Sequence, residues 1–562
     1  MKIRNNKYII IFCSICFFLT ACNDDFDELA VNPNELSLNG FFDTPEGVDQ
    51  AVKGIYGYLA TPRNLGSLGK GMYMHHRSDE MSSGTNQAVS GQHNSKLGPN
   101  LFSIQQPWAL MYTAAFQATG VIENADDADY EGNTELRDAY VGEAHCLRAF
   151  VHYFLLTNFR NIVVIDKVPS DDSELIKGQV SPDEAWDFII SDLIKAKELL
   201  PNKDFWDSSN TGRMTAGAAA GLLGKVYLTR SGIEGIDRYN EAASEFADII
   251  NGVYGPYGLT PNYNDNFGVE NENNEESVLE FQFVGDGDQN REFDPGLVIS
   301  GLFSDPVGFS PPGLRGFDAV VHDWLYDFYA ASIDNDGRTD RRMFGTLVFD
   351  DRLLPNGIPD LNNDNDFTND RLALNAGHTF EEVYFEDGTF GGKWPQAAAY
   401  KAANRKWLDW NLNIEGEYSG RNDRFRETRA HGANWRFIRY ADILLMYAEC
   451  VLNGANASAG SALEAVNVVR ARADVPVLGA LDMDALRTER ILELSLEGHR
   501  GVDLLRWGTI QARMSFLENS DPNFKQFDDG TYFPFESPKN LYLPIPIDEI
   551  QSNPNIIQND GW

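Results

Sequence analysis

Four aromatic side chains lie in glycine- and proline-rich stretches, where they could form a sugar-binding site. Flat aromatic faces pack against the apolar face of a pyranose ring, and short polar side chains then bind its hydroxyls, so such a site needs no nucleophile. Trp407 is followed three residues later by Trp410, and this pair could instead share a helix face and pack in the core. The predicted platforms are Phe303, Phe309, Trp394 and Trp407.

A second stretch, residues 72–93, is rich in Gly, Ser and Asn and carries ionisable side chains. Its candidate ligand contacts are Arg77, Asp79 and His93. Polar loops of this composition are common on protein surfaces, so a solvated loop with no ligand is the alternative interpretation. The residue types alone leave both interpretations open.

Two acidic loops offer oxygen ligands of the kind that calcium prefers. Asp334 and Asp336 precede Gly337, and Asp364 and Asp366 lie in a stretch rich in Asn and Asp. The first loop has its glycine too early for an EF-hand, and the second lacks both that glycine and the closing glutamate. We therefore favour solvated acidic loops over a structural calcium site, and we predict no cofactor.

The common catalytic motifs are absent from this sequence. It contains no Gly-x-Ser-x-Gly nucleophile elbow, no His-Glu-x-x-His zinc motif and no phosphate-binding loop. A glycosidase needs two carboxylates at a fixed separation across a cleft, but among 84 Asp and Glu residues any such pair can be imagined. We predict a binding protein and not an enzyme. A surface glycosidase or lyase and a scaffold that binds only protein are the alternatives.

The composition limits both the fold and the ligand. The chain has 562 residues, of which 43% are hydrophobic and 12% aromatic, so it can bury a large core. It carries 46 Lys and Arg residues against 84 Asp and Glu residues, a formal net charge of -38. A protein that binds nucleic acid by counterion release needs the opposite balance, so that class is excluded. An acidic surface suits a neutral, cationic or calcium-bridged ligand.

The N-terminus has the pattern of a secretion signal. Three basic residues precede an apolar run over residues 8–19, which is too short to span a bilayer. The run ends in Leu19-Thr20-Ala21-Cys22, which resembles the lipobox of bacterial lipoproteins. Cleavage would remove residues 1–21 and leave Cys22 to be acylated. Residues 22–43, which begin with a polar, acidic stretch, would then form a tether that leads into the first helix.

The cysteines agree with export but define no disulfide framework. Of five cysteines, Cys13 and Cys16 would leave with the signal and Cys22 would be acylated. Cys146 and Cys450 remain, both on apolar helix faces, where buried free thiols and a disulfide are both open. No later apolar run reaches 18 residues, so lipid alone would anchor the chain.

Helical periodicity occupies both ends of the chain. Apolar residues recur there at i, i+3, i+4 and i+7, and serine and proline caps mark several starts. The stretch 215–229 is rich in Ala and Gly and offers a narrow face to 238–250, as in the helical hairpins of tetratricopeptide arrays. The predicted helices cover 44–60, 106–128, 134–158, 181–200, 215–229, 238–250, 441–452, 462–469 and 484–497.

Residues 255–435 have a different character. Gly, Asn, Asp, Pro and aromatic residues dominate, and helical periodicity lapses except near 317–330. We predict a mainly α fold, a tetratricopeptide-like helical superhelix with a large irregular, loop-rich ligand-binding insertion. Its parts are an N-terminal helical part at 44–254, the loop-rich region at 255–435 and a C-terminal helical part at 436–562.

The C-terminal part holds the most specific motifs of the chain. Arg436–Glu449 reads RFIRYADILLMYAE, and it is followed by Glu497-Gly498-His499-Arg500 and by Arg506-Trp507-Gly508. In order and spacing these motifs, together with the lipobox, resemble the SusD/RagB family of Bacteroidota outer-membrane lipoproteins. The resemblance extends over nearly the whole chain.

The resemblance implies a role at the cell surface. Proteins of this family are lids on a SusC-like TonB-dependent transporter, and they capture glycans or peptides outside the cell. It also implies a ligand-proximal loop near residues 72–93, with Asp79 at a commonly acidic position. We therefore expect a glycan-binding lipoprotein of the cell outer membrane, facing the exterior, that delivers its ligand to that transporter. A RagB-like peptide-binding lipoprotein is the alternative.

The charged residues of the family motifs lie on or beside apolar helix stripes. Charged side chains in such places are buried only when they are paired. We therefore expect them to form buried or partly buried ion pairs and not to face the ligand. They are Arg148, Arg439, Glu449, Glu497, Arg500 and Asp503.

Overall fold

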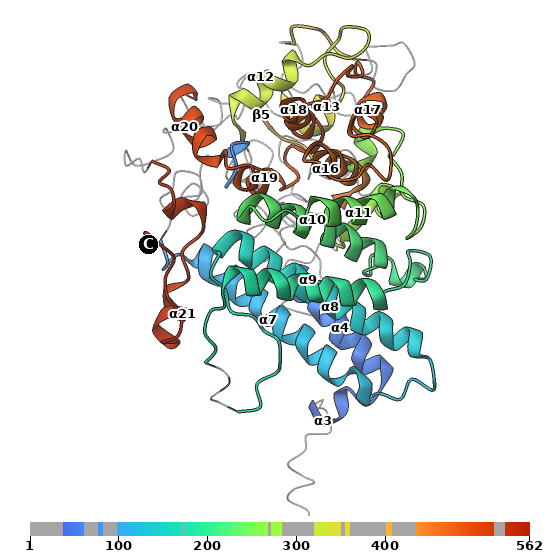
Figure 1. Cartoon of the computed structure of the whole chain (residues 1–562), viewed down its shortest axis with the longest axis vertical. Helices are drawn as coiled ribbons and strands as arrows, with labels where there is room; N and C mark the ends of the chain where they lie inside the picture. The colour runs from blue at the N-terminus through green and yellow to red at the C-terminus, as the bar shows by residue number, and fades with distance from the viewer. Residues whose placement is uncertain are drawn as a thin grey trace, which may run out of the picture.

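Helices packed side by side form the body of the protein in the computed structural model (Figure 1). The structure describes residues 38–60, 77–82, 98–171, 174, 176–267, 271–283, 320–349, 354–359, 401–406, 434–521 and 534–562. The α-helices are α3 Leu38–Phe41, α4 Pro45–Ala60, α7 Phe102–Asn124, α8 Thr134–Phe159, α9 Pro182–Leu199, α10 Ala216–Glu234, α11 Tyr239–Ile250, α12 Asp323–Ala331, α13 Arg342–Thr346, α16 Tyr440–Leu452, α17 Ala462–Arg472, α18 Met483–Leu494, α19 Arg500–Arg506, α20 Ile510–Ser520 and α21 Ile547–Ser552.

The helices stack in chain order. α4 packs on α7, α7 on α8, α8 on α9, α9 on α10 and α10 on α11, and the row continues through α16 to α17 and α18. Each helix therefore contacts its neighbours in the row, which is the arrangement of a helical-repeat superhelix. The predicted tetratricopeptide-like fold is confirmed.

Local signals explain where several helices begin and end. Ser181 caps α9 through a capping box with Glu184, and Pro182 occupies the first turn, as the sequence predicts. Thr215 caps α10, which ends at Gly235 in the left-handed region with φ 68°. Ser461 forms a second capping box, at the start of α17. These helix boundaries depend on short-range chemistry, so sequence reasoning finds them.

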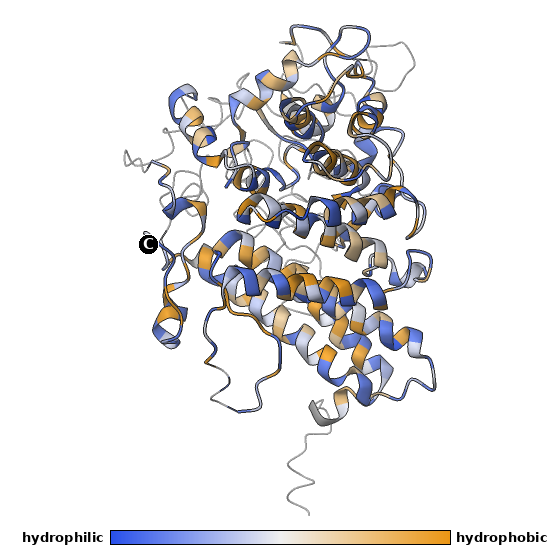
Figure 2. Ribbon diagram, in the orientation of Figure 1, coloured by the Kyte–Doolittle hydropathy of each residue, from blue (hydrophilic) through white to orange (hydrophobic). Residues whose placement is uncertain are grey.

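The core follows the stack. Apolar side chains line the facing sides of the helices, and hydrophilic ones lie on the outside (Figure 2). The largest completely buried side chains include Trp108, Trp186 and Trp435. A second, smaller core lies under α12 and α13. Among the described helices, none is both long and apolar enough to cross a membrane.

Short strands tie the loop-rich region to the helices. The strands are β1 Met81–Ser82, β2 Ser277–Phe281, β3 Val320–Val321, β4 Leu347–Phe349, β5 Ala402–Asn404 and β6 Trp435–Arg439. β2 and β6 pair antiparallel against α10, and the other four form one sheet in the order β1-β3-β5-β4. The helix expected near 317–330 is found as α12. The region is thus irregular between its strands but anchored by them.

The helix predicted at 484–497 ends early. α18 stops at Leu494, and Leu496 and Gly498 adopt positive φ values of 66° and 93° before α19 begins. The prediction that one helix reaches residue 497 is therefore wrong. Its apolar periodicity continues past the turn, but Glu497 turns inward to pair with Arg439 and Lys406.

The small-residue face of α10 yields a stability prediction. An added Cβ at Gly224 would lie 2.5 Å from Cε1 of Phe246, a fully buried ring on α11. We expect Gly224→Ala to lower the free energy of unfolding by about 1–3 kcal/mol through overpacking. Urea denaturation measures this change. The matched control is Gly120→Ala on α7, where a Cβ meets nothing within 4 Å, and this change should stabilise by up to about 1 kcal/mol.

Candidate functional site

The four-stranded sheet anchors the segments that carry the predicted ligand contacts. Its register aligns Ser82 of β1 with Val320 of β3, and Val320 with Ala403 of β5. β1 and β5 run in one direction and β3 in the other. The chain therefore leaves the sheet after Ser82, enters it at Val320 and leaves it again after Asn404, all at the same end.

This end of the sheet brings together the attachment points of three stretches, 83–97, 284–319 and 407–433. The predicted contacts His93, Phe303, Phe309 and Trp407 belong to these stretches and lie outside the described residues. Trp394 also lies outside them, in a stretch that joins β4 to β5 at the opposite end of the sheet, where Phe349 pairs with Ala402. Their contact with a ligand stays a prediction.

Two of these stretches are also joined at their other ends. β2 and β6 pair so that Phe281 faces Trp435. The backbone N–H of Phe283 donates to Oδ1 of Asn434 at 2.7 Å. Phe283, which precedes residues 284–319, and Asn434, which follows residues 407–433, therefore lie beside each other.

A buried lysine fixes the chain just before Trp407. Lys406 is almost completely buried, and its Nζ donates to Oε1 of Glu497 at 2.6 Å. Burial lowers the pKa of Lys406 to about 8, although the Glu497 carboxylate opposes this shift. The C-terminal motif thus positions the exit of the candidate stretch from the sheet.

The segment 77–82 is pinned by long-range contacts. The Arg77 guanidinium donates to Oδ1 of Asn158 at 2.9 Å and to the Leu541 carbonyl at 2.5 Å. Asp79 has no exposed surface, and its carboxylate accepts hydrogen bonds from Arg500 at 2.7 and 2.9 Å and from Arg513. This geometry corrects the expected role of Asp79, because its oxygens hold the chain before β1 and do not face solvent.

Two adjacent carboxyl groups in this segment have opposite pKa shifts. Burial alone would raise the pKa of Asp79, but the Arg500 and Arg513 guanidiniums outweigh it and hold the pKa at about 2. Burial raises the pKa of Glu80 to about 7, with the Arg500 charge opposing and the Asp79 charge adding to the shift. Asp79 is therefore ionised at neutral pH, while Glu80 is close to its midpoint.

The raised pKa of Glu80 predicts a pH-dependent stability. A carboxyl group with a raised native pKa adds stability that is complete below pH 4.5 and is lost as the pH rises through about 7. We expect Glu80→Gln to be more stable than the wild type at pH 8 by up to about 3 kcal/mol. At pH 4 the difference should nearly vanish. Thermal denaturation of both proteins at the two pH values measures it, and an equal difference at both would contradict this account.

The charged motif residues are buried in ion-pair networks, as predicted. Five cations and five carboxylates form the largest network, which we call the Arg439 cluster: Arg342, Lys406, Arg439, Arg470 and Arg472 with Glu276, Asp340, Glu489, Glu493 and Glu497. A second network joins Lys225, Arg490 and Arg506 to Asp442, Glu449 and Asp503. Arg148 pairs with Asp192 across α8 and α9 at 2.8 Å.

The acidic turn at Asp334 uses one carboxylate oxygen of that residue for hydrogen bonds within the turn. Oδ1 of Asp334 accepts the backbone N–H groups of Asp336 at 3.0 Å and Arg338 at 2.8 Å. In the part of the chain that the structure describes, no three His, Cys, Asp or Glu residues are grouped to hold a metal. Asp364 and Asp366 lie outside that part. Cys146 and Cys450 are both buried free thiols, which settles the open question about a disulfide.

Comparison with protein families identifies the chain. The model of the SusD family matches residues 228–562, more than half of the sequence. The chain belongs to the SusD family. A second family model, described as starch-binding and associating with the outer membrane, matches residues 29–228 of this SusD-family protein, which supports outer-membrane association. The two matches meet within α10.

Relatives of this SusD-family protein match it over most of its length. A SusD-like protein of Bacteroides ovatus is 26% identical over 522 residues, covering 90% of this chain and 83% of the relative. A SusD-like protein of Formosa agariphila is 24% identical and covers 100% of this chain and 99% of the relative. A solved structure of surface glycan-binding protein A from Bacteroides thetaiotaomicron in complex with laminarihexaose has a TM-score of 0.66 at 21% identity, covering 92% and 99% of the two chains. This likeness confirms the fold.

Arg513 on α20 and Glu80 beside Asp79 both shape the 77–82 segment. Glu80 lies in the predicted stretch 72–93 but is not among its predicted ligand contacts. Sequence reasoning missed Arg513 altogether. Arg513 gives no local signal, because its partner Asp79 is 434 positions away.

Proposed function

We propose that this SusD-family protein is a non-catalytic, surface-exposed lipoprotein that captures a glycan and delivers it to a SusC-like TonB-dependent transporter. Cys22 carries the lipid that holds it to the outer membrane. The glycan is bound by the stretches that attach to the four-stranded sheet, with Phe303, Phe309, Trp394 and Trp407 as aromatic platforms. The helical superhelix supplies a stiff face for the transporter.

The shared attachment of three candidate stretches at one end of the sheet is the observation that carries this proposal. Ser82, Val320 and Ala403 align across the strands. The described ends of the stretches that carry Phe303, Phe309 and Trp407 therefore lie at one end of this sheet, and binding loops are commonly attached to a rigid scaffold in this way. Lys406 and Asp79 fix two of the three attachment points through buried ion pairs.

The ligand class is supported by the fold relatives. The protein with the bound laminarihexaose is described as a surface glycan-binding protein, and it covers 92% of this chain. The abundance of aromatic residues and the acid excess favour a glycan without strong negative charge. A neutral polysaccharide is therefore the first ligand to test.

Affinity electrophoresis with a sugar-release assay tests capture. The purified protein is run through gels that contain neutral or anionic polysaccharides, and the gels are assayed for released sugar. Retardation without release supports the proposal. Release would identify an enzyme. The absence of retardation in every gel would favour a peptide ligand or a pure scaffold.

Two matched variants locate the binding site in the same gels. Trp394→Ala should lose retardation if this ring is a platform, since stacking on aromatic rings provides much of the affinity for sugars. Phe205→Ala removes a partly exposed ring that packs on Trp206 and should leave retardation unchanged. For the anchor and partner, Cys22→Ala should release the protein from membranes, and the wild type should copurify with the transporter.

A further inference from the structure

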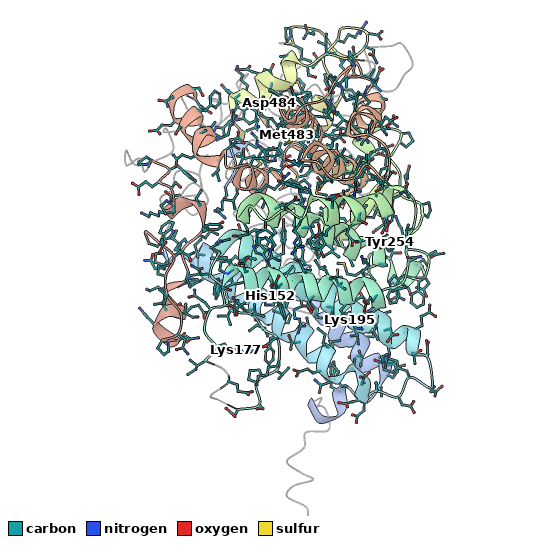
Figure 3. The ribbon with its side chains drawn as sticks, viewed as in Figure 1. His152, Lys177, Lys195, Tyr254, Met483 and Asp484 are labelled. Carbon is teal, nitrogen blue, oxygen red and sulfur yellow. The ribbon has the colours of Figure 1, made fainter. Side chains whose placement is uncertain are left out.

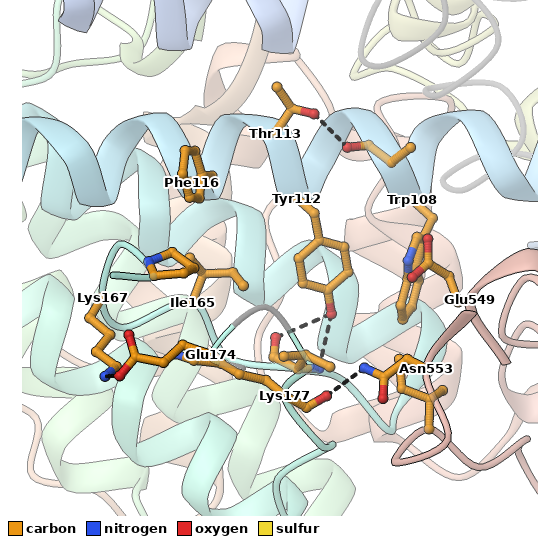
Figure 4. A pocket seen from close by; sticks show the side chains of 14 residues that line it. Trp108, Tyr112, Thr113, Phe116, Ile165, Lys167, Glu174, Lys177, Glu549 and Asn553 are labelled. Atoms are coloured by element: carbon orange, nitrogen blue, oxygen red, sulfur yellow. Dashed lines mark hydrogen bonds and ion pairs between the residues drawn. The ribbon is translucent and has the colours of Figure 1, made fainter. Parts of the chain in front are cut away.

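A pocket of about 430 Å³ lies on the helical scaffold, away from the candidate stretches. It is formed by α7, by side chains between α8 and α9 that include Val163, Ile165 and Lys177, and by the C-terminal segment around α21 (Figure 4). In Figure 1 these elements lie toward the opposite end of the molecule from α12 and β5. The volume falls within the roughly 300–1,000 Å³ range of small-ligand pockets.

One wall of the pocket is a row of aromatic rings on α7. Trp108, Tyr112 and Phe116 follow at intervals of four residues and so share one face of the helix. The Tyr112 hydroxyl donates to the Val163 carbonyl at 3.1 Å and accepts from its N–H at 2.9 Å, so this ring is held in place. Phe116 is 43% exposed and lies beside Ile165 (Figure 4). Trp108 is almost completely buried and packs on Tyr112, so Phe116 provides the exposed apolar surface that a ligand can contact.

Polar groups border this apolar surface. Glu549 on α21 is half-buried, and burial together with the Asp548 charge raises its pKa, although the neighbouring Trp108 opposes this shift. Oγ1 of Thr113 donates to the Ala109 carbonyl at 2.9 Å, which leaves its lone pairs to accept a hydrogen bond. A carboxylate and a hydroxyl oxygen at the edge of an aromatic wall can accept hydrogen bonds from sugar hydroxyls.

The positive charges at the pocket rim are already compensated. Lys167 pairs with Glu174, and Lys177 pairs with Asp166. Both lysines that line the pocket therefore have a carboxylate partner, and an anionic ligand would have to displace one of them. This balance favours an uncharged ligand that brings hydroxyl groups and an apolar ring face.

We propose that this pocket is a second saccharide-binding site, which takes one or two pyranose units of a neutral glycan. The inference deepens the proposed function and rests on it, because it places sugar contacts on the helical scaffold as well as on the sheet-anchored stretches. Phe116 supplies the stacking surface, and Glu549 and Thr113 accept hydrogen bonds from the hydroxyls. None of the site residues predicted from the sequence is among those that line this pocket.

Saturation-transfer NMR titrations with laminaribiose, cellobiose and maltose test the site. The wild type, Phe116→Ala, Glu549→Gln and the control Phe205→Ala are compared. Phe116 is partly exposed and Glu549→Gln preserves shape, so both variants should fold, and their melting curves check this. We expect at least one disaccharide to bind the wild type and the control equally, and to bind each pocket variant about fivefold more weakly or worse.

The outcomes separate this inference from the proposed function, because polysaccharide retardation is measured on the same variants. Two outcomes overturn the second site but leave the proposed function standing, provided that polysaccharide retards the wild type. In the first, the wild type binds no disaccharide; in the second, it binds a disaccharide but the pocket variants bind it equally well. Loss of both readouts in the wild type overturns both. Binding of N-acetyl-phenylalanine amide in place of any saccharide, with the same dependence on Phe116, would assign the pocket to a protein side chain and overturn the inference.

Discussion

Arg439→Met is expected to lower the free energy of unfolding by about 3–5 kcal/mol, because it removes one partner from a buried network of charges. Arg439 is completely buried, and its guanidinium contacts Glu276 and Glu493 at 2.6 Å and Glu497 at 2.7 Å. Methionine fills a similar volume but leaves the Arg439 cluster with one uncompensated negative charge. Chemical denaturation of the purified protein measures the loss.

The control for this prediction is a lysine in an exposed pair. Lys195 on α9 pairs with Glu198 at 3.4 Å, with both side chains about half exposed (Figure 3). Lys195→Met should change the free energy of unfolding by less than about 1 kcal/mol, since exposed pairs contribute little. An equal loss of stability in both variants would show that burial does not determine how much the Arg439 cluster contributes to the free energy of unfolding.

The position of the Arg439 cluster explains why its loss should matter. Arg439 lies at the end of β6, Glu276 directly precedes β2, and Glu493 and Glu497 lie at and after the end of α18. Lys406 brings in the chain after β5. The cluster therefore fixes the β2–β6 pair and the four-stranded sheet relative to each other, and these are the elements to which the candidate stretches attach.

The helical part of the fold could be predicted because its signals are local. The capping box at Ser181, the proline after it and the apolar face of α8 can all be read within a few residues. The order of the motifs then indicated the family, and the family models confirm it. Burial of the motif charges also followed from their places on apolar faces.

The partners of those charges could not be predicted, because they are far apart in the chain. Arg500 is 421 positions from Asp79, and Arg439 is 163 positions from Glu276. Composition made residues 72–93 look like one polar loop, so Asp79 was expected to face a ligand. The two arginines that bury it are visible only once the chain has folded.

Asp79→Asn is expected to lower the free energy of unfolding by about 2–3 kcal/mol at pH 7, because the pKa of Asp79 is held near 2 in the native protein against 3.8 for the free group. A lowered pKa adds stability above about pH 4, and this stability is lost as the pH falls toward 2. The difference between the variant and the wild type should therefore shrink in acid. Denaturation at pH 7 and at pH 3 measures it.

Asp79→Asn should also weaken glycan capture. A loss of global stability alone would not weaken capture at temperatures well below the melting temperature of the variant. Asp79 fixes the chain two residues before β1, and β1 leads into the stretch that carries His93. The control is Asp484→Asn on α18, whose carboxylate is 88% exposed and pairs with Arg487 at 3.1 Å (Figure 3). That variant should retain both stability and retardation. If Asp79→Asn loses stability but keeps full retardation, the 77–82 segment supports the fold without positioning the ligand.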